Sequence, residues 1–62
     1  MNVKEKIYAI KDKKGMTLSG LAEKADISRD TIMKWDINSP SIKNLQKVAD
    51  ALEVPLTELL GD

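Results

Sequence analysis

The chain of 62 residues contains neither cysteine nor histidine. It therefore cannot form a disulfide, and it lacks the thiolate and imidazole ligands of structural zinc sites, so we expect no metal site and no cofactor. A glycine-rich phosphate loop is also missing, and we find no nucleophile with a base. Turns, caps and helix ends account for Asp26, Asp30 and Asp36. Enzymatic activity is therefore the function that these residues favour least.

Long apolar runs are missing as well. The N-terminal segment, MNVKEKIY, carries charges where a signal peptide would need an apolar run, and no apolar stretch approaches the roughly 20 residues that a bilayer requires. We expect a cytoplasmic protein with no membrane partner. The length favours one domain, 1–62, with one small core, because such a chain buries only about 60% of its unfolded surface. No linker, repeat or low-complexity segment divides it.

Neither sign of charge predominates. Ten lysines and arginines balance ten aspartates and glutamates, so the formal net charge is zero. This balance counts against a nucleic-acid partner, because affinity for DNA depends on neutralising phosphates. The charges are unevenly distributed, however: seven of the ten cations lie within residues 4–29, whereas Glu53, Glu58 and Asp62 are among the last ten residues. A neutral total can therefore include a positive face.

The sequence is rich in apolar residues at helical spacing. They predict an all-α chain with helices at about 3–13, 18–24, 28–36, 42–52 and 56–60. Asn2, Thr17 and Ser28 are suited to cap the first three helices, and Gly15 is suited to end the first in a left-handed conformation. The fourth helix has a predicted buried stripe, which consists of Ile42, Leu45, Val48, Ala49 and Leu52.

Residues 18–37 have the pattern of a helix-turn-helix, two short helices joined by a tight turn. Each helix has an apolar face of residues three or four positions apart: Leu18, Leu21, Ala22 and Ala25 in the first helix, and Ile32 and Trp35 in the second. Ala22 is small where the two helices would cross most closely, which suggests a fixed crossing angle. The rest of the chain, on this interpretation, supports this motif.

A family resemblance rests on the run LAEKADISRDTIMKW and on Asp36, Pro40 and SIKNLQKVADALEV after it. These residues resemble the lambda-repressor-like helix-turn-helix family of Cro and XRE regulators over nearly the whole chain. The resemblance implies a compact five-helix domain. It also implies a small phage- or bacterial-type regulator, a Cro-like repressor, that binds specific double-stranded DNA as a homodimer. In that family the second helix of the motif enters the major groove, and dimers read two half-sites about one helical turn apart.

Four side chains of the second motif helix are predicted to contact bases. Burial of Ile32 and Trp35 turns the remaining positions outward, and these are Arg29, Asp30, Met33 and Lys34. Arginine suits the acceptors of guanine, aspartate the amino group of cytosine, methionine the methyl group of thymine, and lysine either guanine or a phosphate. Composition alone would make these four an ordinary solvated helix face, whereas the resemblance favours DNA contact.

A second set is predicted to contact the DNA backbone. Its members carry small polar or basic groups near helix starts or in the loop that the family uses for phosphates: Thr17, Ser28, Thr31, Asn38, Ser39, Ser41, Lys43 and Asn44. The resemblance also implies an ion pair between Lys11 and Asp36 that would clamp the first helix to the end of the second motif helix. The alternative is two unrelated surface charges.

The last helix is more apolar than so short an element needs. We expect Leu56, Leu59 and Leu60 to fill the core first and, on their remaining surface, to contact a second copy of the chain. An alternative function uses the same scaffold as a protein interaction module, for example an antirepressor or a subunit that binds another regulator. The salt dependence of DNA affinity distinguishes the two functions, because only phosphate contacts make affinity fall steeply with salt.

Overall fold

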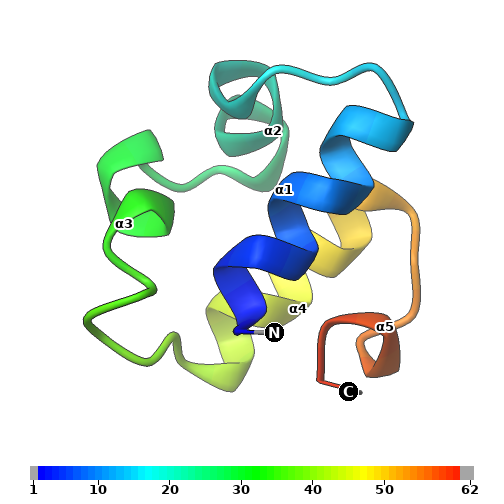
Figure 1. The fold of residues 1–62 in the computed structure, drawn as a ribbon. Coiled ribbons are helices and arrows are strands. Elements are labelled where there is room, and N and C mark those ends of the chain that lie inside the picture. The colour runs from blue at the N-terminus through cyan, green and yellow to red at the C-terminus, as the bar shows by residue number, and fades with distance from the viewer. Residues whose placement is uncertain (1, 61–62) are drawn as a thin grey trace.

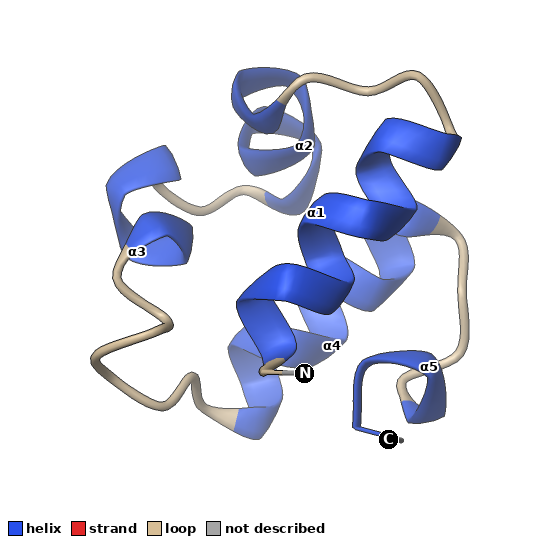
Figure 2. Cartoon of the chain, in the orientation of Figure 1, coloured by secondary structure: helices blue, strands red, loops and turns tan. Residues whose placement is uncertain are grey.

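The computed structural model describes residues 2–60, which form five helices and no strand (Figure 2). In chain order the helices are α1 (Val3–Lys13), α2 (Leu18–Ala25), α3 (Arg29–Met33), α4 (Ile42–Leu52) and α5 (Thr57–Leu60). The predicted all-α class with five helices is confirmed. Within this part of the chain no helix is long and apolar enough to cross a membrane.

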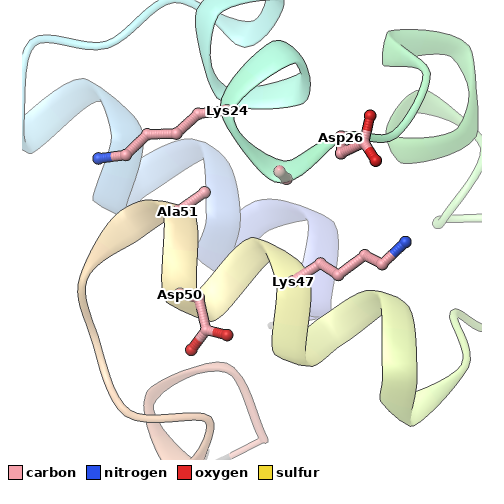
Figure 3. Close-up of a pocket in the computed structure, with 6 residues that line it drawn as sticks. Lys24, Asp26, Lys47, Asp50 and Ala51 are labelled. Carbon is pink, nitrogen blue, oxygen red and sulfur yellow. The ribbon is translucent and has the colours of Figure 1, made fainter.

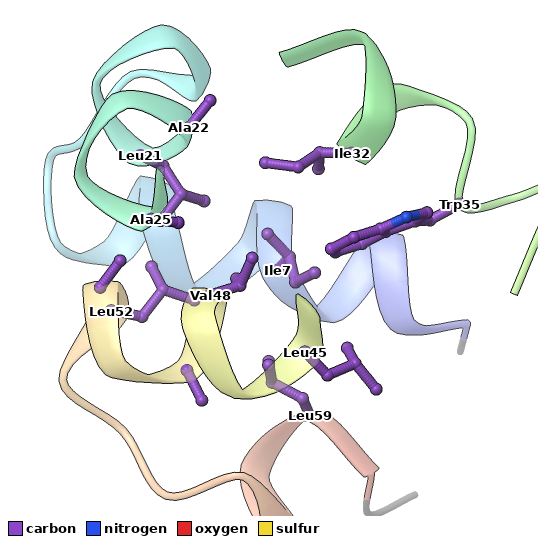
Figure 4. Packing of buried hydrophobic residues seen from close by; sticks show 12 residues of the cluster. Ile7, Leu21, Ala22, Ala25, Ile32, Trp35, Leu45, Val48, Leu52 and Leu59 are labelled. Carbon is purple, nitrogen blue, oxygen red and sulfur yellow. The ribbon is translucent and has the colours of Figure 1, made fainter. Parts of the chain in front are cut away.

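The helices surround one core, and α3 stands at an edge of the molecule (Figure 1). Helix α2 packs against α4 and α3, whereas α5 packs against α1 and α4. The core takes residues from every helix, as Figure 4 shows: Ile7, Leu21, Ala22, Ala25, Ile32, Trp35, Leu45, Val48, Ala49, Ala51, Leu52 and Leu59. One predicted core residue is wrong. Ile42 is 61% exposed, because it is the first residue of α4 and lies a turn before Leu45, the first buried residue of that helix.

Helix α3 is shorter than the predicted range 28–36. After Met33 the backbone continues as turns, in which the Trp35 N–H donates to the Ile32 carbonyl at 3.1 Å and the Asn38 N–H to the Lys34 carbonyl at 2.8 Å. The first of these bonds spans three residues rather than four, so the chain tightens as the helix ends. The tightened turn leaves the indole of Trp35 in the core, only 6% exposed.

Three helices end in the same way. Gly15, Asp26 and Glu53 have φ values of 73°, 60° and 59°, each just after the end of a helix. In each case the next residue closes the end by donating its N–H to a carbonyl five residues earlier: Met16 to Lys11, Ile27 to Ala22, and Val54 to Ala49. That residue is also apolar and packs against the core. The α4–α5 corner thus repeats the backbone of the α2–α3 corner.

Candidate nucleic-acid interface

Helix α3 is fixed at its start and on its inner side. The Ser28 hydroxyl accepts a hydrogen bond from the Thr31 N–H at 3.2 Å, which satisfies one of the free amides of the first turn, as predicted for this cap. The N–H of the preceding residue, Ile27, is held by the Ala22 carbonyl of α2. On the inner side, Ile32 and Trp35 are buried in the core shared by all five helices (Figure 4). These contacts leave α3 one orientation relative to α2.

The outer side of α3 carries the four residues that the sequence predicts as base contacts. Arg29, Asp30 and Lys34 are exposed, and Met33 is 46% exposed although its side chain is large and apolar. All four are therefore exposed, three of them on α3 and Lys34 at the cap that ends it. The set combines two cations, one carboxylate and one thioether, so its chemistry is mixed rather than purely basic.

Arg29 makes a contact that the sequence did not predict. Its guanidinium Nη1 donates a hydrogen bond to the Ser19 hydroxyl of α2 at 3.1 Å. Ser19 is an exposed serine ten positions earlier in the chain, and no local pattern distinguishes it from any other surface serine. Only the crossing of α2 and α3 brings it to Arg29.

The predicted Lys11–Asp36 ion pair is wrong. Asp36 Oδ2 accepts from Lys4 Nζ at 3.2 Å, and Lys11 Nζ donates instead to its neighbour Asp12 at 2.6 Å. Lys4 and Lys11 lie two turns apart on the same face of α1, and both ammonium groups lie over the ring of Tyr8, at 5.6 and 5.4 Å from its centre. The segment after α3 meets the first turn of α1 rather than the last, so Lys4 forms the clamp.

The predicted backbone contacts include three helix caps. The hydroxyl oxygens of Thr17, Ser28 and Ser41 each accept an N–H bond at the start of a helix, from Gly20, Thr31 and Asn44. Each hydroxyl still has its O–H hydrogen free to donate, and a phosphate oxygen could accept that hydrogen bond. The remaining predicted residues are exposed, as are Asn38, Ser39 and Lys43, or half-buried, as are Thr31 and Asn44.

The predicted apolar contact surface on α5 is smaller than expected. Leu59 is only 2% exposed, so it fills the core, as first expected. The second expectation, a contact with another copy, is wrong for this residue because almost none of its surface remains exposed. Leu56 is half-buried and packs against the core, whereas Leu60 is 54% exposed. Two further apolar side chains are exposed: Ile37 lies within the loop between α3 and α4, and Ile42 is the first residue of α4.

A separate hollow of about 330 Å³ lies where α2 crosses α4 (Figure 3). Lys24 and Asp26 reach it from the end of α2, Lys47 and Asp50 reach it from α4, and Ala51 lies between them. At the end of α4, Lys24 Nζ also contacts Glu53 Oε2 at 3.4 Å. Carboxylates and ammonium groups alternate around this hollow, so it gives a polyanion no net attraction. The face of α3 is the better candidate for a nucleic-acid interface.

Comparison with known proteins agrees with this geometry. A helix-turn-helix family model matches residues 7–59, which include all the buried core residues named above. The chain is also 34% identical, over 64 residues, to an immunity repressor protein of Bacillus phage phi105; the match covers 100% of this chain and 44% of that protein. The chain thus spans less than half the length of this curated relative. It belongs to the lambda-repressor-like helix-turn-helix family of DNA-binding transcription regulators.

Proposed function

We propose that the chain binds a specific double-stranded DNA sequence with α3 in the major groove, and that it represses transcription from promoters overlapping that sequence. The observation that carries the proposal is that α3 has one buried side and one exposed side. Ile32 and the following Trp35 anchor it in the core, while Arg29, Asp30, Met33 and Lys34 project from it. Similarity to a phage immunity repressor supports repression as the outcome of binding.

The four projecting side chains offer different contacts to base edges. Arg29 suits the O6 and N7 acceptors of guanine, and Asp30 suits the amino group of cytosine. Met33 supplies an apolar surface for a thymine methyl group, while Lys34 reaches guanine or a phosphate. Because this set includes a carboxylate, which phosphates repel, its sequence preference depends more on matching bases than on charge alone.

The caps at the starts of α2, α3 and α4 complete the interface. Thr17, Ser28 and Ser41 would each donate a hydroxyl hydrogen to a phosphate oxygen, and Lys43, in the first turn of α4, would add a charged contact. Such contacts position the protein on the duplex without reading its sequence. With a formal net charge of zero, we expect weak binding to random DNA and a large share of the affinity from the specific site.

We further propose that the bound form is a homodimer. Leu60, at the end of α5, and Ile42, at the start of α4, are large apolar side chains that the core leaves exposed, and Leu56, just before α5, is partly accessible. A symmetric pair of α3 helices would read two half-sites about 10 base pairs apart from centre to centre. The DNA site would then be an inverted repeat.

The test is selection of bound duplexes from a random library at two ionic strengths. We expect an enriched inverted repeat, and an affinity that falls with salt with a logarithmic slope of about −0.9 for each phosphate neutralised. Failure to enrich any sequence would contradict the proposal. Salt-insensitive binding to another protein, with none to DNA, would instead favour an interaction module, the function for which exposed Met33 and Leu60 are the supporting observation.

A further inference from the structure

Helix α2 restrains the longest side chain on the outer face of α3. The bond from Arg29 Nη1 to Ser19 Oγ, 3.1 Å long, joins the first residue of α3 to the second residue of α2. Both residues are exposed, so neither side chain is needed to fill the core. The contact therefore acts on the orientation of the guanidinium rather than on the packing of the helices.

From this contact we infer that Ser19 is a positioning residue for base recognition by Arg29, an inference that rests on the proposed function. An arginine side chain has many rotamers, and restricting them on binding reduces affinity. A bond made before DNA arrives removes part of that entropic cost. It also fixes the plane of the guanidinium, and thus the base pair that its donor fork can face.

The chemistry of the two groups fits this role. A guanidinium has five N–H donors in a planar arrangement, and the single hydroxyl of Ser19 accepts one of them. Two parallel donors suffice for guanine, so the arginine keeps enough of them for bidentate recognition. Ser19 is also neutral, so it leaves the positive charge of Arg29 available to the DNA, which a carboxylate in its place would not.

The residue beside Ser19 leaves this surface open. Gly20 is exposed, and a Cβ added to it would meet only the Thr17 hydroxyl oxygen, at 3.1 Å, within 4 Å. Because Gly20 has no side chain, it adds no atoms to the surface next to Ser19 in the chain. The pair lies at the junction of α2 and α3, which stand next to one another in Figure 1.

The experiment is a double-mutant cycle on the affinities for the selected site and for its single-base variants. Arg29→Ala should lower discrimination at one base pair by roughly 5- to 150-fold, the range of a lost bidentate contact. Ser19→Ala should lower discrimination at that same base pair by roughly 3- to 10-fold, because the hydrogen bond that orients the guanidinium is lost and this bond, being exposed, has the effect of an ordinary one. In the Arg29→Ala background, Ser19→Ala should have no further effect on discrimination. With Arg29 present, Ser19→Thr keeps the hydroxyl and should discriminate as well as the unmodified protein.

The melting temperature distinguishes positioning from a structural role. Both Ser19 variants should have the same melting temperature as the unmodified protein. Gln46→Ala is the matched control, because it removes an exposed side-chain hydrogen bond, to Asp50 at 2.9 Å, on a helix away from α3; it should leave discrimination unchanged. The inference is overturned if Ser19→Ala weakens all sequences equally, or changes nothing while Arg29→Ala relaxes one base pair. Arg29→Ala without effect at any base pair would overturn base reading by Arg29 as well.

Discussion

At the scale of single residues, two buried side chains decide what α3 presents to the outside. Ile32 is fully buried and Trp35 nearly so, and together they leave Arg29, Asp30, Met33 and Lys34 as the outer face. These two anchors could be predicted, because apolar residues three apart must share one face of a helix. The partner of Asp36 could not: Lys4 and Lys11 are equivalent in helical phase, and only the packing of α1 selects between them.

Trp35→Ala should unfold most of the protein. Removing a buried indole costs roughly 3–5 kcal/mol, which is comparable to the entire stability of a domain this small. Urea denaturation followed by circular dichroism measures the loss. Ile37→Ala is the control, since Ile37 is apolar but exposed, and its effect should stay within about 0.5 kcal/mol. Equal stability of the two variants would show that the indole does not anchor α3.

Arg29→Ala and Lys43→Ala should weaken DNA binding in different ways. Loss of a guanine contact lowers discrimination at one base pair by ~1–3 kcal/mol, whereas loss of a phosphate contact weakens every sequence about equally and lowers the salt slope by about one. Fluorescence anisotropy with the selected site and with random DNA, over a range of salt, separates the two effects. Identical behaviour of the variants on both DNAs would contradict the assignment of α3 to the bases.

At the scale of elements, the fold depends on how its helices end. The caps Asn2, Thr17 and Ser28 and the left-handed Gly15 could be predicted from residue type. The end of α4 could not, because glutamate rarely adopts φ near 60° and only the packing of Val54 behind it requires that conformation. The short length of α3 escaped prediction for a similar reason: the tertiary position of Trp35, not local preference, tightens the turn.

Glu53→Gly should stabilise the protein. An L-residue in the left-handed region costs roughly 1–2 kcal/mol that glycine does not pay, and the exposed contact with Lys24 that would be lost contributes little. Thermal unfolding should show an increase of about 4–8 °C in melting temperature for each kcal/mol gained. Glu53→Ala removes the same carboxylate but keeps the Cβ, so it should bring no such gain. A melting temperature that falls in the glycine variant would show that this conformation is not strained.

At the scale of the whole molecule, the net charge is zero, but polar and apolar side chains are exposed in different places on the surface. The outer face of α3 holds polar side chains of both signs, while Ile42 and Leu60 are exposed apolar groups outside α3. The sequence predicted that Leu56, Leu59 and Leu60 would all fill the core first and share an apolar contact surface, but Leu59 is buried and Leu60 is exposed. Spacing alone does not show which of two adjacent leucines faces inward when an element is only one turn long.

Leu60→Glu should weaken binding to the full inverted repeat more than binding to a half-site. A charge in an apolar contact between two copies disfavours their association, while the DNA-contacting face of each copy is unchanged. Sedimentation of the protein with each duplex measures the stoichiometry. Gln46→Glu adds the same charge at an exposed position of α4 and should leave the stoichiometry unchanged. Loss of half-site binding in Leu60→Glu alone would place α5 at the DNA rather than between copies.

The most direct test of the central claim, that the outer face of α3 reads base edges, is an NMR measurement of intermolecular contacts on the selected duplex. The Met33 methyl group should show nuclear Overhauser contacts to major-groove protons such as a thymine methyl, and the signals of Arg29 and Lys34 should shift on binding. Contacts from α5 to the DNA, with the Met33 methyl group remaining solvent-exposed in the complex, would contradict it.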